Sequence, residues 1–172
     1  MISRFVMTRR ANSAIDADVM VHPDTETGGL LPCRVVGDSS IAPFTIGAGP
    51  KAVRTPTRFS PDTEYQQQLL DFAFEVLALN FGGAWHKHPG DLDEPSAYDL
   101  KTARHIVTDR EWNVEQAVFP IAVVRDGQVR LRAYLMRRSA LEFEEIPIEV
   151  VSDADPRVVE ILSGSQAAKR EV

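Results

Sequence analysis

The chain has 172 residues, which is enough for one ordinary domain and too few for two. Its hydrophobic fraction of 44% and charged fraction of 26% are those of a folded globular protein and exclude a chain that is disordered throughout. The formal net charge is −6 and Lys and Arg form no cluster, so the sequence predicts no nucleic-acid-binding surface.

Cysteine usage and hydropathy narrow the class further. Cys33 is the one cysteine, which excludes an internal disulfide and a cysteine-based zinc site, so any metal must be bound by His and carboxylate side chains. The N-terminus lacks the apolar core of a signal peptide, and no stretch approaches the ~20 apolar residues of a membrane span. We therefore expect a cytoplasmic protein with no membrane partner.

The first part of the chain predicts short strands. Alternating residues indicate a strand over 17–22, and residues 30–36 and 40–46 indicate two more, joined by a hairpin turn at Gly37-Asp38. Residues 47–58 are rich in Gly, Pro, Lys and Arg, and this composition predicts a loop.

A helix is predicted to begin at Ser60-Pro61-Asp62. Serine suits the N-cap, proline suits the first helical position, and aspartate complements the helix dipole. Apolar residues follow at helical spacing and are expected to face the core: Tyr65, Leu69, Phe72, Val76 and Leu79.

The remaining elements alternate between strands and helices. They are a strand over 81–88, a loop over 89–95, a helix over 96–109, a hairpin of strands 117–124 and 129–136, a strand over 146–151, and a helix over 156–162. This order favours an α/β fold with a mixed β-sheet packed by helices. We expect a single domain over 1–162 and a flexible C-terminal tail over 163–172.

Two histidines stand two positions apart in the segment His86-Lys87-His88-Pro89. Residues i and i+2 of an extended chain point to one face, so both imidazoles can bind one ion while Lys87 points the other way. Asp99 follows in the first turn of a predicted helix, where its carboxylate can face the two imidazoles. Two His and one carboxylate leave the fourth position of a tetrahedral zinc site open for water, which is the pattern of a catalytic site.

Each part of this pattern has a simpler alternative. A His-x-His pair alone is weak evidence for a metal site. The segment Ser96-x-x-Asp99 is also a capping box, although one residue can cap the helix while the other binds metal. Glu26, before Gly28-Gly29, is either the carboxylate that metal-assisted hydrolysis needs beside the attacking water or ordinary turn chemistry.

Together these residues resemble the motif of the JAMM (JAB1/MPN) metallopeptidases. Glu-x-Gly-Gly-Leu-Leu from Glu26 and His-x-His-Pro-x6-Ser-x-x-Asp from His86 match at every motif position, and the resemblance covers about residues 24–136. Less specific matches favour the prokaryotic JAB branch, which is associated with bacterial ubiquitin-like conjugation systems. They lie in the segments 47–52 and 59–62, at Gln66-Gln67 and at Trp85.

The resemblance implies a JAB1/MPN fold, a mixed sheet between helices similar to that of cytidine deaminases. It also implies Zn²⁺ bound by His86, His88 and Asp99. Glu26 would take a proton from the zinc-bound water and return it to the leaving amine. The Ser96 hydroxyl would stabilise the oxyanion of the tetrahedral intermediate.

The implied substrate is an amide or isopeptide bond after the C-terminal Gly of a ubiquitin-like protein, cleaved in deconjugation or precursor processing. Its extended tail would bind by adding a strand to a sheet edge. E1-like and E2-like proteins would be further partners. Two other hypotheses stay open: a zinc hydrolase acting on a small amide or a carrier-protein tail, and a non-catalytic MPN scaffold. The complete motif argues against the scaffold.

Two features depart from the family pattern. Lys87 stands where family members usually carry Ser or Thr between the histidines, and its predicted direction is away from the metal. Residues 1–23 show no amphipathic helix of the kind that precedes the motif glutamate in many members.

Overall fold

The structure is a computed structural model that describes the backbone of residues 1–167 and the side chains of residues 1–163. Within that range the strands are β1 (Arg4–Thr8), β2 (Gly28–Val36), β3 (Ser39–Ala42), β4 (Val53–Thr55), β5 (Arg58–Ser60), β6 (Asn80–Lys87), β7 (Gln116–Arg125), β8 (Gln128–Arg137), β9 (Phe143–Ile146) and β10 (Ile148–Val151). The helices are α1 (Arg9–Val21), α2 (Thr63–Leu77), α3 (Ala97–Thr108) and α4 (Pro156–Ala167). The predicted mixed sheet with packed helices is confirmed.

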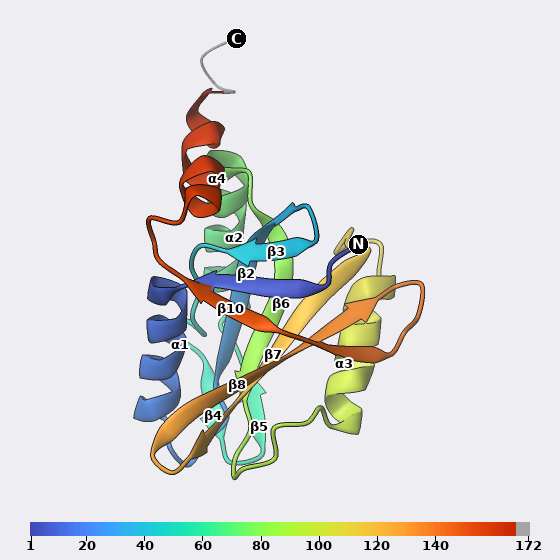
Figure 1. Ribbon diagram of the computed structural model, residues 1–172. Coiled ribbons are helices and arrows are strands. Elements are labelled where there is room, and N and C mark those ends of the chain that lie inside the picture. The colour runs from blue at the N-terminus through green and yellow to red at the C-terminus, as the bar shows by residue number, and fades with distance from the viewer. Residues whose placement is uncertain (168–172) are drawn as a thin grey trace.

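Eight strands form one sheet in the order β10-β1-β3-β2-β6-β7-β8-β9. β1 runs parallel to β10 and β3, β6 runs parallel to β7, and the other neighbours are antiparallel. Only Pro147 separates β9 from β10, and the Phe5 N–H donates to its carbonyl at 2.9 Å. The segment 143–151 therefore supplies the outermost strand at both ends of the order (Figure 1).

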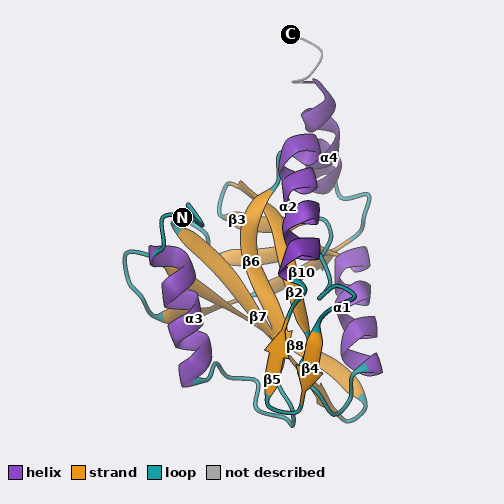
Figure 2. Ribbon diagram, turned by 180° about the vertical axis from the view of Figure 1, so that it is seen from behind, coloured by secondary structure: helices purple, strands orange, loops and turns teal. Residues whose placement is uncertain are grey.

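The residues of β7 separate two hydrophobic layers, because successive side chains of a strand point to opposite faces. Val118 and Ala122 belong to the layer of α1, whereas Ala117 and Phe119 belong to the layer of α3. These two helices therefore cover opposite faces of the sheet, and α2 packs against α4 (Figure 2).

The N-terminal segment forms a helix, so the predicted strand over 17–22 is wrong. Thr8 caps α1 by accepting a hydrogen bond from the Ala11 N–H at 3.1 Å. Ala11, Ile15 and Val19 recur every fourth residue and are fully buried. The expected absence of an N-terminal amphipathic helix is therefore wrong too. The buried stripe is narrower than an ordinary amphipathic face, which explains why the sequence pattern does not predict it.

A small hairpin, β4–β5, occupies part of the predicted loop over 47–58. Arg54 is paired with Phe59 in its register. Each of its strands has only 3 residues, too few for alternation to predict them. The predicted strand over 40–46 is also shorter than expected: it ends at Ala42, and Ile46 instead forms an isolated bridge.

Helix α2 begins at Thr63, with Asp62 rather than Ser60 as its N-cap. The predicted core stripe is wrong at three positions, because Tyr65, Phe72 and Val76 are 37%, 55% and 38% exposed. Leu69 is half-buried, and Leu79, just after the helix, is fully buried as predicted. The face turned to the protein is the parallel stripe one residue later, a rotation of about 100° around the axis. Its members are Gln66, Leu70, Ala73 and Leu77.

The second half of the chain follows the prediction closely. The strand before the histidines, the helix after them and the β7–β8 hairpin are confirmed, with Asp126 and Gly127 at the turn. Pro147 divides the predicted last strand into β9 and β10. Helix α4 continues to Ala167, so the first part of the predicted tail is helical, and residues 168–172 lie outside the described residues.

Cys33 is a small buried residue of the core. Burial raises the pKa of its thiol to about 12, despite an opposing hydrogen bond with Ser40.

Gly83 allows β6 and β7 to approach each other at Val118. Its φ is +150°, and an added Cβ would lie 1.7 Å from the Val118 carbonyl oxygen. Backbone atoms of a central strand cannot move aside without breaking the ladder, so only glycine fits here.

We expect Gly83→Ala to destabilise the fold by about 3 kcal/mol or more, because it combines a backbone clash with a strained φ. Chemical denaturation monitored by circular dichroism measures this change. Gly47→Ala is the matched control, since a Cβ there meets nothing within 4 Å and the backbone has no positive φ. Equal stability of the two variants would contradict the steric argument.

Candidate metal centre

His86 and His88 project from the end of β6 at the centre of the sheet. His86 is paired with Gly28 of β2 on one side and Ile121 of β7 on the other. The strand geometry continues past Lys87, because the His88 N–H donates to the Ala122 carbonyl at 2.9 Å. Both imidazoles therefore lie on one face of the strand, as predicted from their spacing.

The two imidazoles converge on Asp99 at the start of α3. Asp99 Oδ1 lies 3.1 Å from His86 Nε2, Asp99 Oδ2 lies 3.2 Å from His88 Nε2, and the two Nε2 atoms are 2.8 Å apart. The three side chains offer ligand atoms that all lie within 4.8 Å of one another, which makes them a group that could bind a metal ion. The structure thus brings together the three predicted ligands.

The orientation of His88 is fixed by its other ring nitrogen. Nδ1 lies 2.9 Å from the Leu92 carbonyl oxygen, and because a carbonyl only accepts, Nδ1 carries the proton of this hydrogen bond. In the neutral imidazole Nε2 then presents a lone pair to the Asp99 carboxylate, which is itself an acceptor. Two acceptors facing each other need a positive charge between them, either a proton or a metal ion.

Protonation in this cluster follows from the same contacts. The hydrogen bond to Asp99 raises the pKa of His88, against the opposing effect of burial. Burial raises the pKa of the Asp99 carboxyl, but hydrogen bonds with His86 and His88 outweigh it and hold that pKa well below its usual range. Asp99 therefore stays ionised, and His88 exchanges a proton at a higher pH than an ordinary imidazole.

Ser96 and Asp99 form the capping box that the sequence indicates. The Asp99 N–H donates to Ser96 Oγ at 3.2 Å, and the Ser96 N–H donates to Asp99 Oδ2 at 2.6 Å. Capping and contact with the histidines coexist, because Asp99 uses its two carboxylate oxygens for both. Helix initiation thus places the carboxylate against the imidazoles.

Glu26 reaches the same place from the loop before β2. Its N–H donates to the Thr55 carbonyl of β4 at 3.0 Å, and its half-buried side chain lines one cleft with both histidines, Ser96 and Asp99. All five predicted site residues therefore surround a single cavity.

The two glycines after Glu26 have a steric reason. A Cβ on Gly28 would lie 2.5 Å from the Trp85 carbonyl oxygen, and one on Gly29 would lie 2.2 Å from the Ile46 carbonyl oxygen. A side chain at Gly28 would push β2 away from β6, and one at Gly29 would push it away from the Ile46 bridge. Either change would move the glutamate relative to the histidines.

The cleft has a volume of about 1100 Å³ and is mainly apolar. Several walls of the cleft could not be predicted from the sequence, because the β4–β5 hairpin and β9 come from distant parts of the chain. Alternation in Arg58-Phe59-Ser60 is too short a signal to have found the hairpin. Apolar and aromatic side chains that line the cleft include Leu30, Phe59, Trp85, Leu92, Ile106, Phe119, Ile121 and Phe143.

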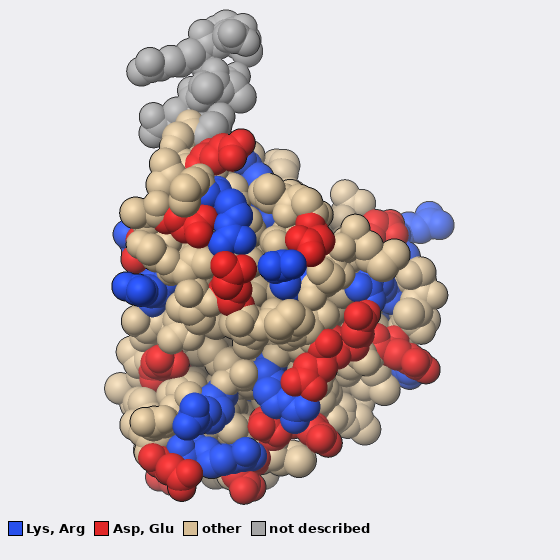
Figure 3. Space-filling model, viewed as in Figure 1, with Lys and Arg blue, Asp and Glu red and all other residues tan. Residues whose placement is uncertain are grey.

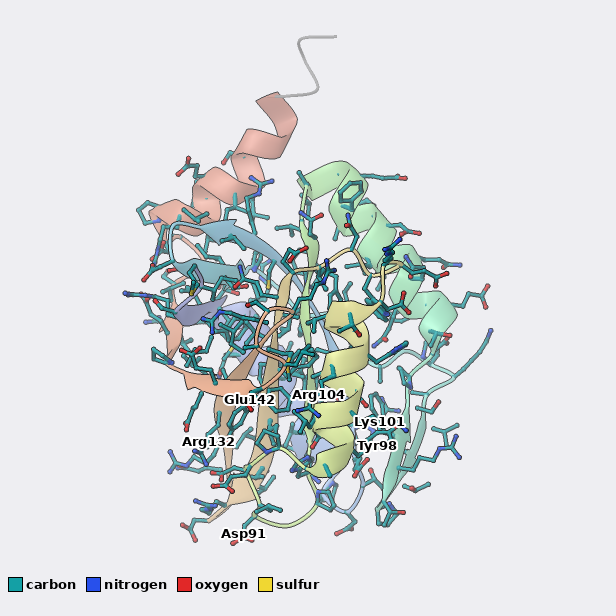
Figure 4. All side chains as sticks on the ribbon, turned by 90° about the vertical axis from the view of Figure 1, so that its right-hand side faces the viewer. Asp91, Tyr98, Lys101, Arg104, Arg132 and Glu142 are labelled. Carbon is teal, nitrogen blue, oxygen red and sulfur yellow. The ribbon has the colours of Figure 1, made fainter. Side chains whose placement is uncertain are left out.

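Helix α3 separates this cleft from a more polar surface. Figure 4 shows Tyr98 and Lys101 on the side of α3 towards the β4–β5 hairpin, and Arg104 on the side towards Glu142. The Arg104 Nε–H donates to the Leu141 carbonyl at 2.8 Å.

On the face shown in Figure 3, acidic and basic side chains are interspersed, and no continuous basic stripe is visible there.

Lys87 points away from the histidines, as predicted, and its contacts were not foreseen. Its ammonium group donates to three backbone carbonyls, those of His22, Pro23 and Thr25. Burial lowers the pKa of Lys87 below its usual value, although the carboxylates of Asp24 and Glu26 act in the opposite direction.

Comparison with known proteins gives these residues a family. No protein-family model matches the chain. The protein named Probable metalloprotease y4qB, from Sinorhizobium fredii (strain NBRC 101917 / NGR234), is 36% identical over 130 residues, which cover 72% of this chain and 79% of that protein. The chain belongs to this metalloprotease family. Family membership therefore supports a metal-dependent peptidase, for which the His-His-Asp group is the candidate metal site.

A solved structure shares the fold. The solution structure of protein DSY2949 from Desulfitobacterium hafniense matches with a TM-score of 0.66 and 18% identity, covering 86% of this chain and 93% of that chain.

Among the described residues, no helix has the length and apolar character needed to cross a membrane.

The raised pKa of His88 predicts how metal binding depends on pH. A metal needs the neutral imidazole, so protons compete as the pH falls through this pKa, which lies above the ordinary value of about 6.5. Below it, we expect affinity to fall about tenfold per pH unit for each proton displaced.

Competition with a chelator between pH 8 and 5 measures this affinity. His105→Ala is the matched control, because His105 lies on the same helix as Asp99 with 70% of its side chain exposed, and its loss should leave the profile unchanged. A profile that stays flat down to pH 5 would contradict a role for His88.

Proposed function

We propose that the protein is a zinc-dependent peptidase of the JAMM type that cleaves after the C-terminal Gly of a ubiquitin-like protein. The observation that carries this proposal is the convergence of His86, His88 and Asp99 within 4.8 Å, with Glu26 lining the same cleft. Membership of a metalloprotease family supports the peptidase chemistry, and the mixed sheet with helices on both faces is consistent with the JAB1/MPN fold.

Zinc is the metal that the donor set favours. Two imidazoles and one carboxylate are the three protein ligands of many catalytic zinc sites, and Cys33 is buried in the core rather than in the cleft. When bound, zinc supplies Lewis acidity, which makes water a nucleophile near neutral pH and polarises a carbonyl group.

Glu26 and Ser96 carry the proton transfer and the charge stabilisation. The Glu26 carboxylate takes a proton from the attacking water and returns it to the leaving amine. Ser96 Oγ accepts a hydrogen bond from the Asp99 N–H, so its own O–H is left to donate towards the developing oxyanion at the edge of the cleft.

The cleft suits an extended peptide. The short hairpin β4–β5 lies at its wall, where Arg58 and Phe59 line the cavity, and an extended tail can add to such an edge by main-chain hydrogen bonds. A tail that ends in glycine meets little steric resistance between apolar walls. E1-like and E2-like proteins in the cytoplasm belong to the same proposal as partners of the modifier.

Two other functions make different predictions. A hydrolase for a small amide or a carrier-protein tail would use the same residues without needing the ubiquitin-like domain. A non-catalytic scaffold would not need a carboxylate beside the ligands, yet Glu26 lines the cleft with all three.

The test is cleavage of a ubiquitin-like protein fused to a reporter through its C-terminal tail. We expect Glu26→Gln to retain about one zinc per chain by elemental analysis while cleavage falls about 10³-fold, because a general base contributes 10²–10⁴-fold. The matched control is Glu75→Gln, at an exposed position of α2, which should cleave at the wild-type rate.

Purified wild-type protein without zinc would overturn the metal assignment. Zinc-loaded protein that cleaves small amides and no ubiquitin-like fusion would favour the alternative hydrolase.

A further inference from the structure

Lys87 is a buried lysine whose ammonium group is fully used. The residue is 1% exposed, and Nζ donates to the carbonyl oxygens of His22, Pro23 and Thr25 at 3.0, 2.7 and 3.0 Å. An ammonium group has three donors, so each of them has a partner. Burying a charge is costly unless such partners compensate for lost water, and an apolar side chain would avoid the cost. Packing alone therefore does not explain why a lysine occupies this buried position.

All of these carbonyls belong to the turn that leads into Glu26. The backbone of Lys87 contacts the residue that follows Glu26. The Lys87 N–H donates to the Thr27 carbonyl at 2.7 Å. Glu26 thus lies between Thr25 and Thr27, and both of those carbonyls are bound by Lys87.

The register of β6 connects these contacts to the metal centre. Side chains of a strand alternate, so His86 and His88 face the cleft while Lys87 reaches the turn on the opposite face. Three consecutive residues therefore carry both imidazoles and the contacts to the backbone on either side of Glu26.

The remaining contacts of the turn come from elements other than β6. The Thr27 hydroxyl donates to Asp18 Oδ2 at 2.6 Å, and Arg54 Nε–H donates to the Thr27 hydroxyl at 3.0 Å. The Glu26 N–H also donates to the Thr55 carbonyl of β4 at 3.0 Å. These three contacts join the turn to α1 and β4, and none of them connects the glutamate to the strand that carries the histidines.

From this geometry we infer that Lys87 is a positioning residue that sets the Glu26 carboxylate relative to the two histidines. Lys87 is not one of the described residues that line the cleft, and its three N–H groups donate to backbone carbonyls. It therefore acts through Glu26 rather than on the substrate. This inference rests on the proposed function, in which Glu26 is the general base.

The test is a double-mutant cycle of Lys87→Met and Glu26→Gln. Methionine keeps a long unbranched chain and removes the donors. We expect Lys87→Met to keep about one zinc per chain and an unchanged KM while kcat falls about 10²-fold, since a misplacement of about 1 Å costs that much. The double variant should match Glu26→Gln within about twofold, because Lys87 acts through Glu26.

Two kinetic results would overturn the inference. One is a wild-type kcat for Lys87→Met, and the other is a double variant slower than Glu26→Gln by the full factor of the lysine change, which is the result for an independent structural role. Lys101→Met removes an exposed lysine of α3 and should leave kcat unchanged.

A second readout needs neither metal nor activity. Amide hydrogen exchange over residues 22–27 of the metal-free protein should be faster in Lys87→Met than in the wild type and the Lys101→Met control. Equal exchange would overturn the inference. If the wild type binds no zinc and cleaves nothing, the proposed function fails, while faster exchange would still support the contact between Lys87 and the turn.

If Lys87→Met does not fold, the wild-type protein still provides a test. The ammonium protons of Lys87 should be detectable by nuclear magnetic resonance, protected from solvent and close to the α-protons of residues 22–25. Ammonium protons that exchange as fast as those of exposed lysines would overturn the inference.

Discussion

The close approach of β2 to β6 is the constraint on which the site depends. Where Gly28 and Gly29 lie beside His86 and Trp85, the space that a side chain would occupy is filled by backbone atoms and by the Trp85 ring. The glutamate before these glycines can therefore reach the first histidine across one strand spacing. A looser pairing would leave the same residues in the sequence without a shared cleft.

The other half of the site depends on helix initiation. The N-terminus of α3 carries unsatisfied N–H groups, and Asp99 satisfies that of Ser96 while its second oxygen contacts His86. One carboxylate thus stabilises the helix end and completes the cluster. The position of the helix and that of the candidate ligand are set by the same hydrogen bonds, so neither can shift alone.

The parts of this site that could be predicted are those governed by short spacings. His86 and His88 share a face because strands alternate, and Ser96 and Asp99 meet because they span one helical turn. Tertiary packing decided the rest. The sequence could not show which stripe of α2 faces the protein, that α1 replaces a strand, or that a turn of backbone carbonyls surrounds Lys87, since carbonyls have no signature in the sequence.

The strand segment 143–151 has a consequence for how the chain reaches this structure. Phe5 is paired with Ile148, so the outer partner of β1 comes from a segment more than 140 residues later in the chain. Contacts between such distant residues slow folding and leave a strand edge exposed in the meantime. The three candidate metal ligands, His86, His88 and Asp99, lie between these two ends of the chain and are available before the outer partner of β1. Metal binding to a partly folded chain in which they have already converged would favour completion of the fold over aggregation.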